Sequence, residues 1–557
     1  MSAKLRVGVV LASAALRGWQ RVLLERIASL ACVELALVAI EGDARVRDAD
    51  VEPRARRTTP LQGIAARVFE SAYRRLERGI CCEHDAFAMC DGTPVLAGIP
   101  RIDRVSRNVD GTQGYEPGEI ERIRALNLDV LLQLHSGAPA AEMASAARYG
   151  LWYLDGRDYP LRSGAPAGFW EVYFARPVTR MQLIKLNGRG EKHVLACSSA
   201  GTHPLSVKLN RSNAYWNALS LVPRKLAQLH TRGEEALHAH KGTPLKATAD
   251  VSALAPDLTA MALQVGRNIG RRARERFKRT FNTEQWILLY HVGDGPCTRI
   301  RDFKRIVPPS DRYWADPHVV CRHGEHYVFI EEYSFKNAKG HISVIRIDKN
   351  GSFTKPTIVL ERPYHLSYPF VFDDAGELYM VPESMQNRTV ELYRCVEFPH
   401  RWEFVCNLLE GISAVDSTLL HHDGKWWLFA NVLENEGGSA SEELFVYYAD
   451  ALLSGNWTPH PRNPVISDVT RARPAGPIQL RDGQLYRPSQ DCSVRYGYAI
   501  RINQIAVLSK EDYAETEISR IKPDWSKNVL GTHTLAYAAG LTVVDALLVR
   551  PKFGQHH

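Results

Sequence analysis

The chain has 557 residues, of which 45% are hydrophobic and 24% charged, and its formal net charge is +8. These values are ordinary for a soluble globular protein, and the length predicts two or three domains. No apolar run reaches the roughly 18 residues of a transmembrane helix, and the ten cysteines include no CxxC pair. We therefore expect a cytoplasmic protein with reduced thiols, no metal site and no nucleic-acid partner.

The amino-terminal half alternates apolar runs with helical periodicity, starting with a buried strand at LRVGVVLA. This alternation predicts an α/β domain whose mostly parallel sheet carries helices on both faces. The expected strands are 5–12, 33–42, 128–136, 150–154 and 180–186, and the expected helices are 14–31, 61–77, 117–126, 139–148 and 212–231.

The segment 149–186 resembles the core of the formyltransferase fold. In that family a short strand with an Asn-x-His motif leads to a loop ending near Arg-Gly-x-x-Pro and then to a Trp-containing helix. Arg162, Gly164, Pro166 and Trp170 fit the loop and helix, and the resemblance covers roughly residues 4 to 230.

The catalytic positions of that family are not matched. Its Asn and His fall at about Trp152 and Leu154, and no carboxylate stands at 187–190. Formyl transfer needs a general base and a group that stabilises the oxyanion, which Trp and Leu cannot provide. We expect a degenerate domain without this activity; altered chemistry at Asp155 or Asp158 is the alternative.

A basic amphipathic helix is expected where the two halves join. Residues 267–279 contain seven Arg or Lys and one Glu, and apolar residues recur every fourth position from Val265 to Phe281. The helix either packs on a neighbouring domain or contacts an anionic surface. That surface is either membrane lipid, which gives peripheral membrane contact through 265–281, or a phosphate-bearing substrate. The predicted organisation is an α/β domain at 1–232, a linker at 233–284 and a second domain at 285–557.

The second half repeats a hairpin five times. Each copy has an apolar run, a glycine and a run rich in aromatic and β-branched residues. The spacings between these glycines are 52, 48, 59 and 57 residues. Self-similarity at about 50 residues with a hairpin unit predicts an all-β five-bladed β-propeller. The central glycines are Gly324, Gly376, Gly424, Gly483 and Gly540.

The repeat also predicts a site. Positions eight before and seven after each glycine face each other across a hairpin, at the end opposite the turn. Five blades bring these ends together at one mouth of the propeller. The polar residues expected there are Asp316, Glu331, Glu332, Tyr368, Glu383, Asp416, Asn431, Gln490 and Asp491, with Arg473, Arg487 and His533 beside them.

Residues 290–545 resemble the amino-terminal domain of plant glucosamine inositolphosphorylceramide transferase, through phrases such as YWADPHV, LYMVPES, VDSTLL and LYRPSQDC. Bacterial proteins carry this domain fused to a formyltransferase-like one, so the resemblance implies a bacterial protein acting in polysaccharide or glycolipid synthesis. In the plant enzyme the transferase chemistry is usually assigned to a separate domain.

A broader resemblance is to five-bladed propellers of the arabinanase type. Those enzymes use a base Asp on the first blade, an Asp that tunes pKa and an acid Glu, and Ala315-Asp316-Pro317 matches the first of these. Glycosyl chemistry requires one protonated and one ionised carboxyl group. The candidate catalytic residues are Asp316, Glu383, Asp416 and Asp491; the candidate substrate-binding residues are Glu331, Glu332, His365, Tyr368, Arg473, Arg487, Gln490 and His533.

Three functions follow from this reading. The first is glycosyl transfer or glycosidic cleavage at the propeller mouth, without a cofactor and with a nucleotide-sugar as a candidate donor. The second is a glycan- or nucleotide-sugar-binding module without catalysis. The third is a sugar N-formyltransferase with displaced catalytic groups. For each carboxylate a structural role at a strand end competes with the catalytic one.

Overall fold

The computed structural model describes residues 3–41, 84–103, 107–109, 112–115, 117–135, 139–156, 168–237, 258–293, 295–435 and 437–552, together with residues 75 and 77. The chain forms two compact units. The first comprises Met1–Ala273 with Asn435–Gly438, and the second comprises Arg274–Glu434 with Ser439–His557. The division falls inside the segment that we expected to be a linker.

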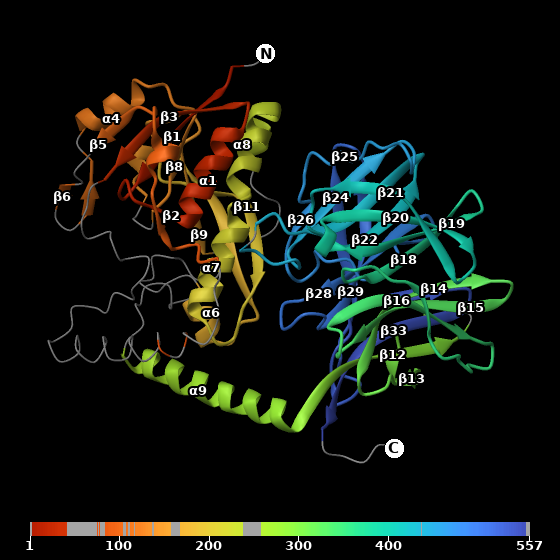
Figure 1. The fold of residues 1–557 in the computed structure, drawn as a ribbon. Helices are drawn as coiled ribbons and strands as arrows, with labels where there is room; N and C mark the ends of the chain where they lie inside the picture. Colours follow the sequence, from red (N-terminus) through yellow and green to blue (C-terminus); the bar gives the residue numbers. More distant parts are fainter. Residues whose placement is uncertain are drawn as a thin grey trace. The chain divides into compact units, whose positions relative to one another are not determined.

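The first unit is built on a seven-stranded sheet with the order β11-β10-β9-β8-β1-β3-β5 (Figure 1). The strands β1, β3, β5, β8 and β9 pair in parallel, and β10 and β11 pair antiparallel at one edge. Their bounds are β1 Leu5–Leu11, β3 Val33–Ile40, β5 Arg101–Asp103, β8 Val130–Gln133, β9 Leu151–Gly156, β10 Val178–Leu186 and β11 Lys192–Gly201.

Helices cover both faces of this sheet because side chains alternate along each strand. Val7 and Val9 share one core with α1 (Gly18–Ser29) and α8 (Leu221–Arg232). Val10 and Leu37 share the other core with α4 (Pro117–Arg124) and α5 (Ala141–Ala144). The mixed α/β sheet agrees with the alternation in the sequence, although β11 was not expected.

The expected helix 212–231 is two helices, α7 (Val207–Ala218) and α8. Pro223 lacks an N–H group, so it fits the first turn of a new helix and not the interior of a long one. The shorter elements of this unit are β2 Leu16–Arg17, β4 Met89–Cys90, α3 Thr93–Leu96, β6 Arg107–Val109, β7 Thr112–Gly114, α6 Phe169–Tyr173 and a 3-10 helix at Gly233–Leu237.

Core residues occupy the positions where a formyltransferase would carry its Asn and His. Trp152 is fully buried, and its indole N–H donates to the carbonyl oxygen of Tyr149 at 3.1 Å. Leu154 packs against the same core. The resemblance to a formyltransferase stays a prediction, because Asp158, Arg162, Gly164 and Pro166 and most of the expected helix 61–77 lie outside the described residues.

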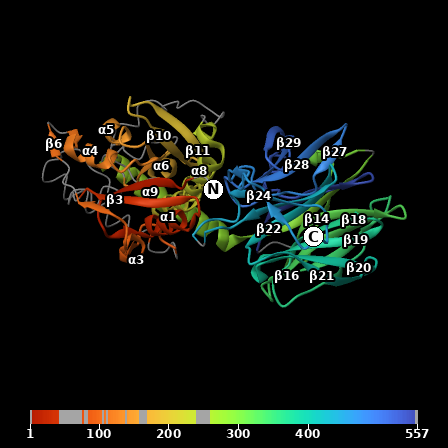
Figure 2. The same ribbon diagram turned by 90° about the horizontal axis from the view of Figure 1, so that it is seen from above.

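The second unit is a five-bladed β-propeller, drawn from green to blue in Figure 2. Four blades are formed by successive strands, and the fifth combines the first strands of the unit with the last. The first blade contains β14 Arg312–Arg322, β15 Glu325–Ser334, β16 Lys339–Ile347 and β17 Thr357–Leu360, and the second contains β18 Ser367–Asp374, β19 Glu377–Ser384, β20 Thr389–Glu397 and β21 Arg401–Glu410. The third blade contains β22 Ala414–His422, β23 Lys425–Val432, β24 Glu443–Ala449, β25 Thr458–Pro459 and β26 Ile466–Ser467, and the fourth contains β27 Gln479–Arg481, β28 Gln484–Asp491, β29 Ala499–Leu508 and β30 Tyr513–Ile521. The fifth blade contains β12 Asn282–Val292, β13 Lys304–Ile306, β31 Val529–Gly531, β32 Leu535–Ala538 and β33 Leu541–Pro551.

Each repeated hairpin closes through a two-residue turn in which both residues have positive φ. In the first blade His323 has φ of 54° and Gly324 has φ of 76°. This is the turn whose twist matches that of the flanking strands, and glycine adopts its second position without steric cost. The other four turns are Ala375–Gly376, Asp423–Gly424, Asp482–Gly483 and Ala539–Gly540.

The ring is held together by apolar clusters between neighbouring blades. Separate clusters join the first blade to the second, the second to the third, the third to the fourth, the fourth to the fifth and the fifth to the first. Trp426 belongs to the cluster between the second and third blades, and Trp427 belongs to the cluster between the third and fourth, so both are core residues. The ring closes where β12 pairs with β33 from Asn282 to Val292.

Candidate active site

A β-bulge interrupts the first strand of each of three blades at the position eight residues before the turn glycine. Pairing in the first hairpin runs from Ala315 directly to His318, so two residues oppose one. The second and third hairpins break in the same way, and the first of the two residues inside each break has a left-handed backbone. These residues are Asp316, Tyr368 and Asp416, with φ of 51°, 42° and 52°.

The bulges allow each of these side chains to reach another blade. The carboxylate of Asp316 accepts hydrogen bonds from the Thr534 hydroxyl at 2.9 Å and from the Tyr368 N–H at 3.3 Å. The Tyr368 hydroxyl accepts from the Gly476 N–H at 2.8 Å. The three equivalent positions therefore meet, as the repeat predicted, and we call the buried polar group around them the axial cluster.

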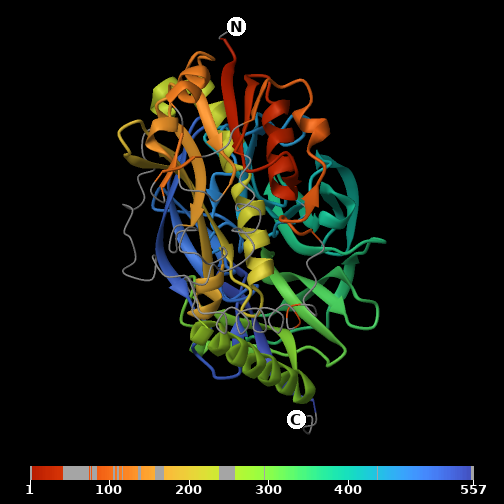
Figure 3. The same ribbon diagram turned by 90° about the vertical axis from the view of Figure 1, so that its left-hand side faces the viewer.

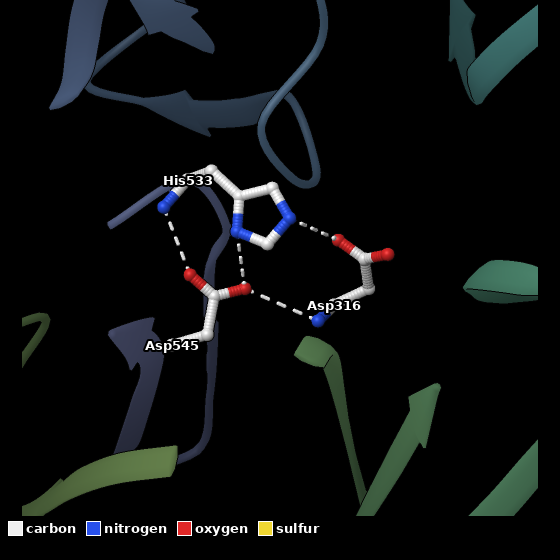
Figure 4. Close-up of side chains that lie close together, drawn as sticks. All are labelled: Asp316, His533 and Asp545. Carbon is white, nitrogen blue, oxygen red and sulfur yellow. Dashed lines mark hydrogen bonds and ion pairs between the residues drawn. The ribbon is translucent and has the colours of Figure 1, made fainter. Parts of the chain in front are cut away.

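An imidazole lies between two carboxylates in this cluster (Figure 4). His533 places Nδ1 2.7 Å from Asp545 and Nε2 3.2 Å from Asp316. Burial disfavours the imidazolium, but the two carboxylates outweigh burial, so the pKa of His533 is raised above its ordinary value. Asp545 also accepts the backbone N–H groups of Asp316, His533 and Thr534, which fixes the His533 segment in place.

The same three side chains are the only described group in the chain with metal-ligand geometry. Asp316, His533 and Asp545 each offer one ligand atom, and these atoms lie within 4.8 Å of one another. Because His533 contacts both carboxylates directly, a charged imidazolium satisfies the same oxygen atoms.

A second part of the axial cluster is arranged around the guanidinium group of Arg473. Arg473 donates from Nε and Nη2 to the two oxygens of Asp416, at 2.6 and 3.2 Å, and Gln490 donates to Asp416 at 2.7 Å. Arg473 also lies 3.6 Å from Glu383. Three donors hold the Asp416 carboxylate in one orientation, and the Arg473 guanidinium balances its negative charge.

The pKa values of two glutamates of the cluster are raised, and Glu383 holds its proton at neutral pH. Burial, reinforced by the charge of Asp416, raises the pKa of Glu383 to about 8, although Arg473 opposes the shift. Burial and the charge of Asp316 raise the pKa of Glu331 well above its ordinary value. Asp316 has its pKa raised by burial to about 6, with His533 opposing. The cluster thus combines a protonated acid with an ionised carboxylate at pH 7.

One ring position is left without a partner. Asn431 stands seven residues after Gly424, is fully buried, and has no hydrogen-bond partner for either its amide nitrogen or its amide oxygen within the described residues. Buried amides are nearly always paired, so this one is available to a bound polar group.

The solvent edge of the cluster is formed by less buried groups. The Tyr496 ring, 45% exposed, lies 5.3 Å from the His533 ring, and its hydroxyl accepts a hydrogen bond from Arg473 at 3.4 Å. Tyr313 donates to Glu331 at 2.9 Å, and His365 lies 3.4 Å from the same carboxylate.

Three of the expected site residues are placed elsewhere, which corrects the sequence reading. Arg487 forms a buried pair with Glu515 at 2.7 Å, Asp491 pairs with Arg501 at 2.6 Å, and Glu332 pairs with Arg312 at 2.8 Å. Each lies an odd number of residues from Gln490 or Glu331 on the same strand, and alternation turns it to the opposite face. The expected residues that the structure does bring together are Asp316, Glu331, His365, Tyr368, Glu383, Asp416, Arg473, Gln490 and His533.

Sequence reasoning missed Asp545, Tyr313, Tyr496 and Thr534. Asp545 was detectable, because it is a lone acid in the apolar run LTVVDALL. It stands five residues after Gly540, and five has the same parity as seven, so it points to the same face as the other ring residues. Tyr496 gave no signal, because it lies between β28 and β29 and outside the hairpin count.

Comparison with known proteins finds a family and curated relatives that are similar to the second unit. Residues 296–531 match the family model "Glucosamine inositolphosphorylceramide transferase 1, N-terminal", so the carboxyl-terminal region carries this family. Glucosamine inositolphosphorylceramide transferase 1 of Arabidopsis thaliana is 38% identical over 213 residues, covering 38% of this chain and 28% of the plant protein. The protein of the same name from Oryza sativa subsp. japonica is 36% identical over 214 residues, with the same coverage. The chain therefore spans little more than a quarter of the length of these relatives.

Solved structures with partial likeness include the α-L-arabinofuranosidase PaAbf62A of Podospora anserina, with a TM-score of 0.34, 12% identity, and coverage of 47% of this chain and 98% of that one. The family 117 glycoside hydrolase Zg3597 of Zobellia galactanivorans gives a TM-score of 0.32, 11% identity, and coverage of 47% and 90%. The five-bladed architecture rests on the strand pairing and the interblade clusters described above.

Proposed function

We propose that the axial cluster is the site of a carbohydrate-active enzyme that transfers or cleaves a glycosyl unit. The observation that carries the proposal is the crowding of carboxyl groups that differ in protonation state. Five carboxyl groups surround two cations, Arg473 and His533, and burial and neighbouring charge keep Glu383 protonated while Asp316 is ionised at pH 7. The cluster contains the buried carboxyl groups of Asp316, Glu331, Asp416 and Asp545 and the carboxyl group of Glu383, whose side chain is 11% exposed. A purely structural core would not need this arrangement, whereas acid–base chemistry does.

The roles follow from the protonation states. Glu383 carries a proton at neutral pH and borders Arg473, so it serves as the acid that protonates a leaving oxygen. Asp316 is ionised above about pH 6 and provides the base or the negative charge that stabilises an oxocarbenium-like centre. Asp416 is saturated by Arg473 and Gln490, so it orients the other groups and tunes their pKa values. Asn431 is free to bind a sugar hydroxyl.

The names of the plant relatives support a glycosyl acceptor attached to a lipid, and we extend that substrate class to this chain as part of the proposal. The reaction then belongs to polysaccharide or glycolipid synthesis, with a nucleotide-sugar as the candidate donor. A bacterial source and a cytoplasmic location stay predictions.

The proposal is tested by measuring binding and turnover with a panel of nucleotide-sugars and oligosaccharides. We expect the wild-type protein to bind one of them and to release free sugar or nucleoside diphosphate. Glu383→Gln should retain binding and lose turnover, and Asp416→Asn should lose both. Asp491→Asn is the matched control, because its carboxylate pairs with Arg501 on the other face of the strand, and it should keep both.

A binding module without catalysis is the second candidate, and the saturation of Asp416 favours it, since oriented acceptors suit recognition as well as catalysis. Binding that depends on Asp416 but never leads to turnover would select this function. Binding that is unchanged in Asp416→Asn would exclude the axial cluster as the site.

A further inference from the structure

Helix α9 (Leu258–Phe281) buries its polar side and exposes its apolar side. Gln264 and Asn268 are each 1% exposed, and Gln264 donates to Asn268 at 3.2 Å. By contrast, Ile269 is 52% exposed and Phe277 65% exposed. This is the reverse of a helix that packs an apolar stripe on its own protein.

The exposed apolar residues form one continuous stripe. Spacings of three and four residues connect them, apart from the adjacent Ile269 and Gly270, and at 100° per residue all of them fall within an arc of about 120° on a single helical face. Gly266 and Gly270 lie within the stripe, and a Cβ added to either would meet no atom of the described residues within 4 Å, so no described part of the chain covers this face. The stripe consists of Leu263, Gly266, Ile269, Gly270, Ala273, Phe277 and Phe281. Figures 1 and 3 show α9 as one unbroken helix.

Cations border this stripe on both sides. Seven Arg or Lys residues and one Glu lie between 267 and 279. At 100° per residue, Arg274 and Lys278 fall beside one edge of the stripe and Arg276 beside the other. Arg267 lies between Arg274 and Lys278 on the first edge, and Arg271 lies further round the helix. They donate to the carbonyl oxygens of Tyr173 and Pro204, at 3.1 and 3.0 Å, which anchors the helix from one side of the stripe.

We propose that this face of α9 docks on an anionic lipid surface. A stripe of Ile and Phe flanked by Arg matches an interface in which the apolar side chains enter the acyl boundary and the guanidinium groups meet lipid phosphates. A second copy of the chain is a poorer occupant, because it would bring another seven cations to the contact. A nucleic-acid backbone would satisfy the cations but leave Ile269, Phe277 and Phe281 in water. The proposal is independent of the function assigned to the axial cluster.

The test is co-sedimentation of the full chain with vesicles of phosphatidylcholine alone or of equal parts phosphatidylcholine and phosphatidylglycerol. We expect binding to the anionic vesicles only, weakening as salt is raised. Phe277→Ser with Phe281→Ser should weaken binding by at least about tenfold, from the apolar surface removed. Glutamine in place of Arg274, Arg276, Lys278 and Arg279 should weaken it by at least about a hundredfold.

Matched controls are available on the second unit. Leu453 and Leu480 are 54% and 60% exposed, so the double change Leu453→Ser with Leu480→Ser removes similar surface away from α9 and should leave vesicle binding intact. All of these positions are exposed, so the melting temperature should stay unchanged and a folding defect can be recognised. Equal binding to neutral vesicles, absence of binding to anionic vesicles, or a dimer in solution that the phenylalanine changes dissolve would each overturn the proposal.

Discussion

Asp316 and Asp416 hold nearly the same left-handed backbone conformation, with φ of 51° and 52°, at equivalent positions of the first and third blades. Non-glycine residues rarely adopt this conformation, and such residues gather at functional sites where the surrounding structure enforces them. The β-bulges of the first and third blades thus each direct an aspartate carboxylate toward another blade.

The conformation predicts a difference between two neutral replacements of Asp416. Asn tolerates positive φ, whereas β-branched Thr does not, and both remove the charge that pairs with Arg473. We expect Asp416→Thr to have a free energy of unfolding about 1–2 kcal/mol lower than Asp416→Asn. Denaturant unfolding of the two variants measures this, and equal stabilities would contradict the strained backbone.

The protonation state of Glu383 predicts how stability depends on pH. Its pKa in the folded protein is about 8, above the ordinary 4.5, so the proton stabilises the native state fully below about pH 4.5, and this contribution is lost as pH rises through 8. Glu383→Gln mimics the protonated acid, so its melting temperature should match that of the wild type near pH 4 and exceed it at pH 8. Thermal melting at both pH values checks this. A variant that is less stable by the same amount at both would show that Glu383 has an ordinary pKa.

If the axial cluster is catalytic, the rate should follow a bell-shaped pH profile. The ionised Asp316 is required on the acid side, with a pKa of about 6, and the protonated Glu383 on the alkaline side, with a pKa of about 8. The apparent values belong to the interacting group as a whole. We expect the maximum of kcat/KM between about pH 6 and pH 8; a rate that keeps rising above pH 9 would exclude Glu383 as the acid.

Arg487 and Glu515 provide a structural contrast, since both side chains are 1% exposed and they pair at 2.7 Å. Arg487→Leu leaves a buried carboxylate uncompensated and should lower the free energy of unfolding by about 3–5 kcal/mol. The double change Arg487→Leu with Glu515→Leu should recover most of this loss. The folded double variant should bind ligand as well as the wild type does. A loss of binding in this variant would show that Arg487 belongs to the ligand site.

The five hairpins could be predicted from the sequence, because glycine in a two-residue turn and alternating apolar residues are local requirements. The positions that meet could also be predicted, since residues counted from Gly324 or Gly376 keep their register along a strand. Asp316, Glu383, Asp416 and Gln490 were found in this way. The counting also included residues one position away, such as Glu332 and Asp491, although alternation along a strand turns them to the opposite face.

The role of each carboxylate depends on contacts that form only in the folded ring. The pairing of Asp416 with Arg473, and of His533 with Asp316, joins residues from different blades, and no local rule specifies such partners. The strand β12 completes the fifth blade from the far end of the unit, a contact between residues distant in sequence that the repeat could not reveal. Burial and neighbouring charge set the pKa values of Glu383 and Asp316, and both depend on the closed ring.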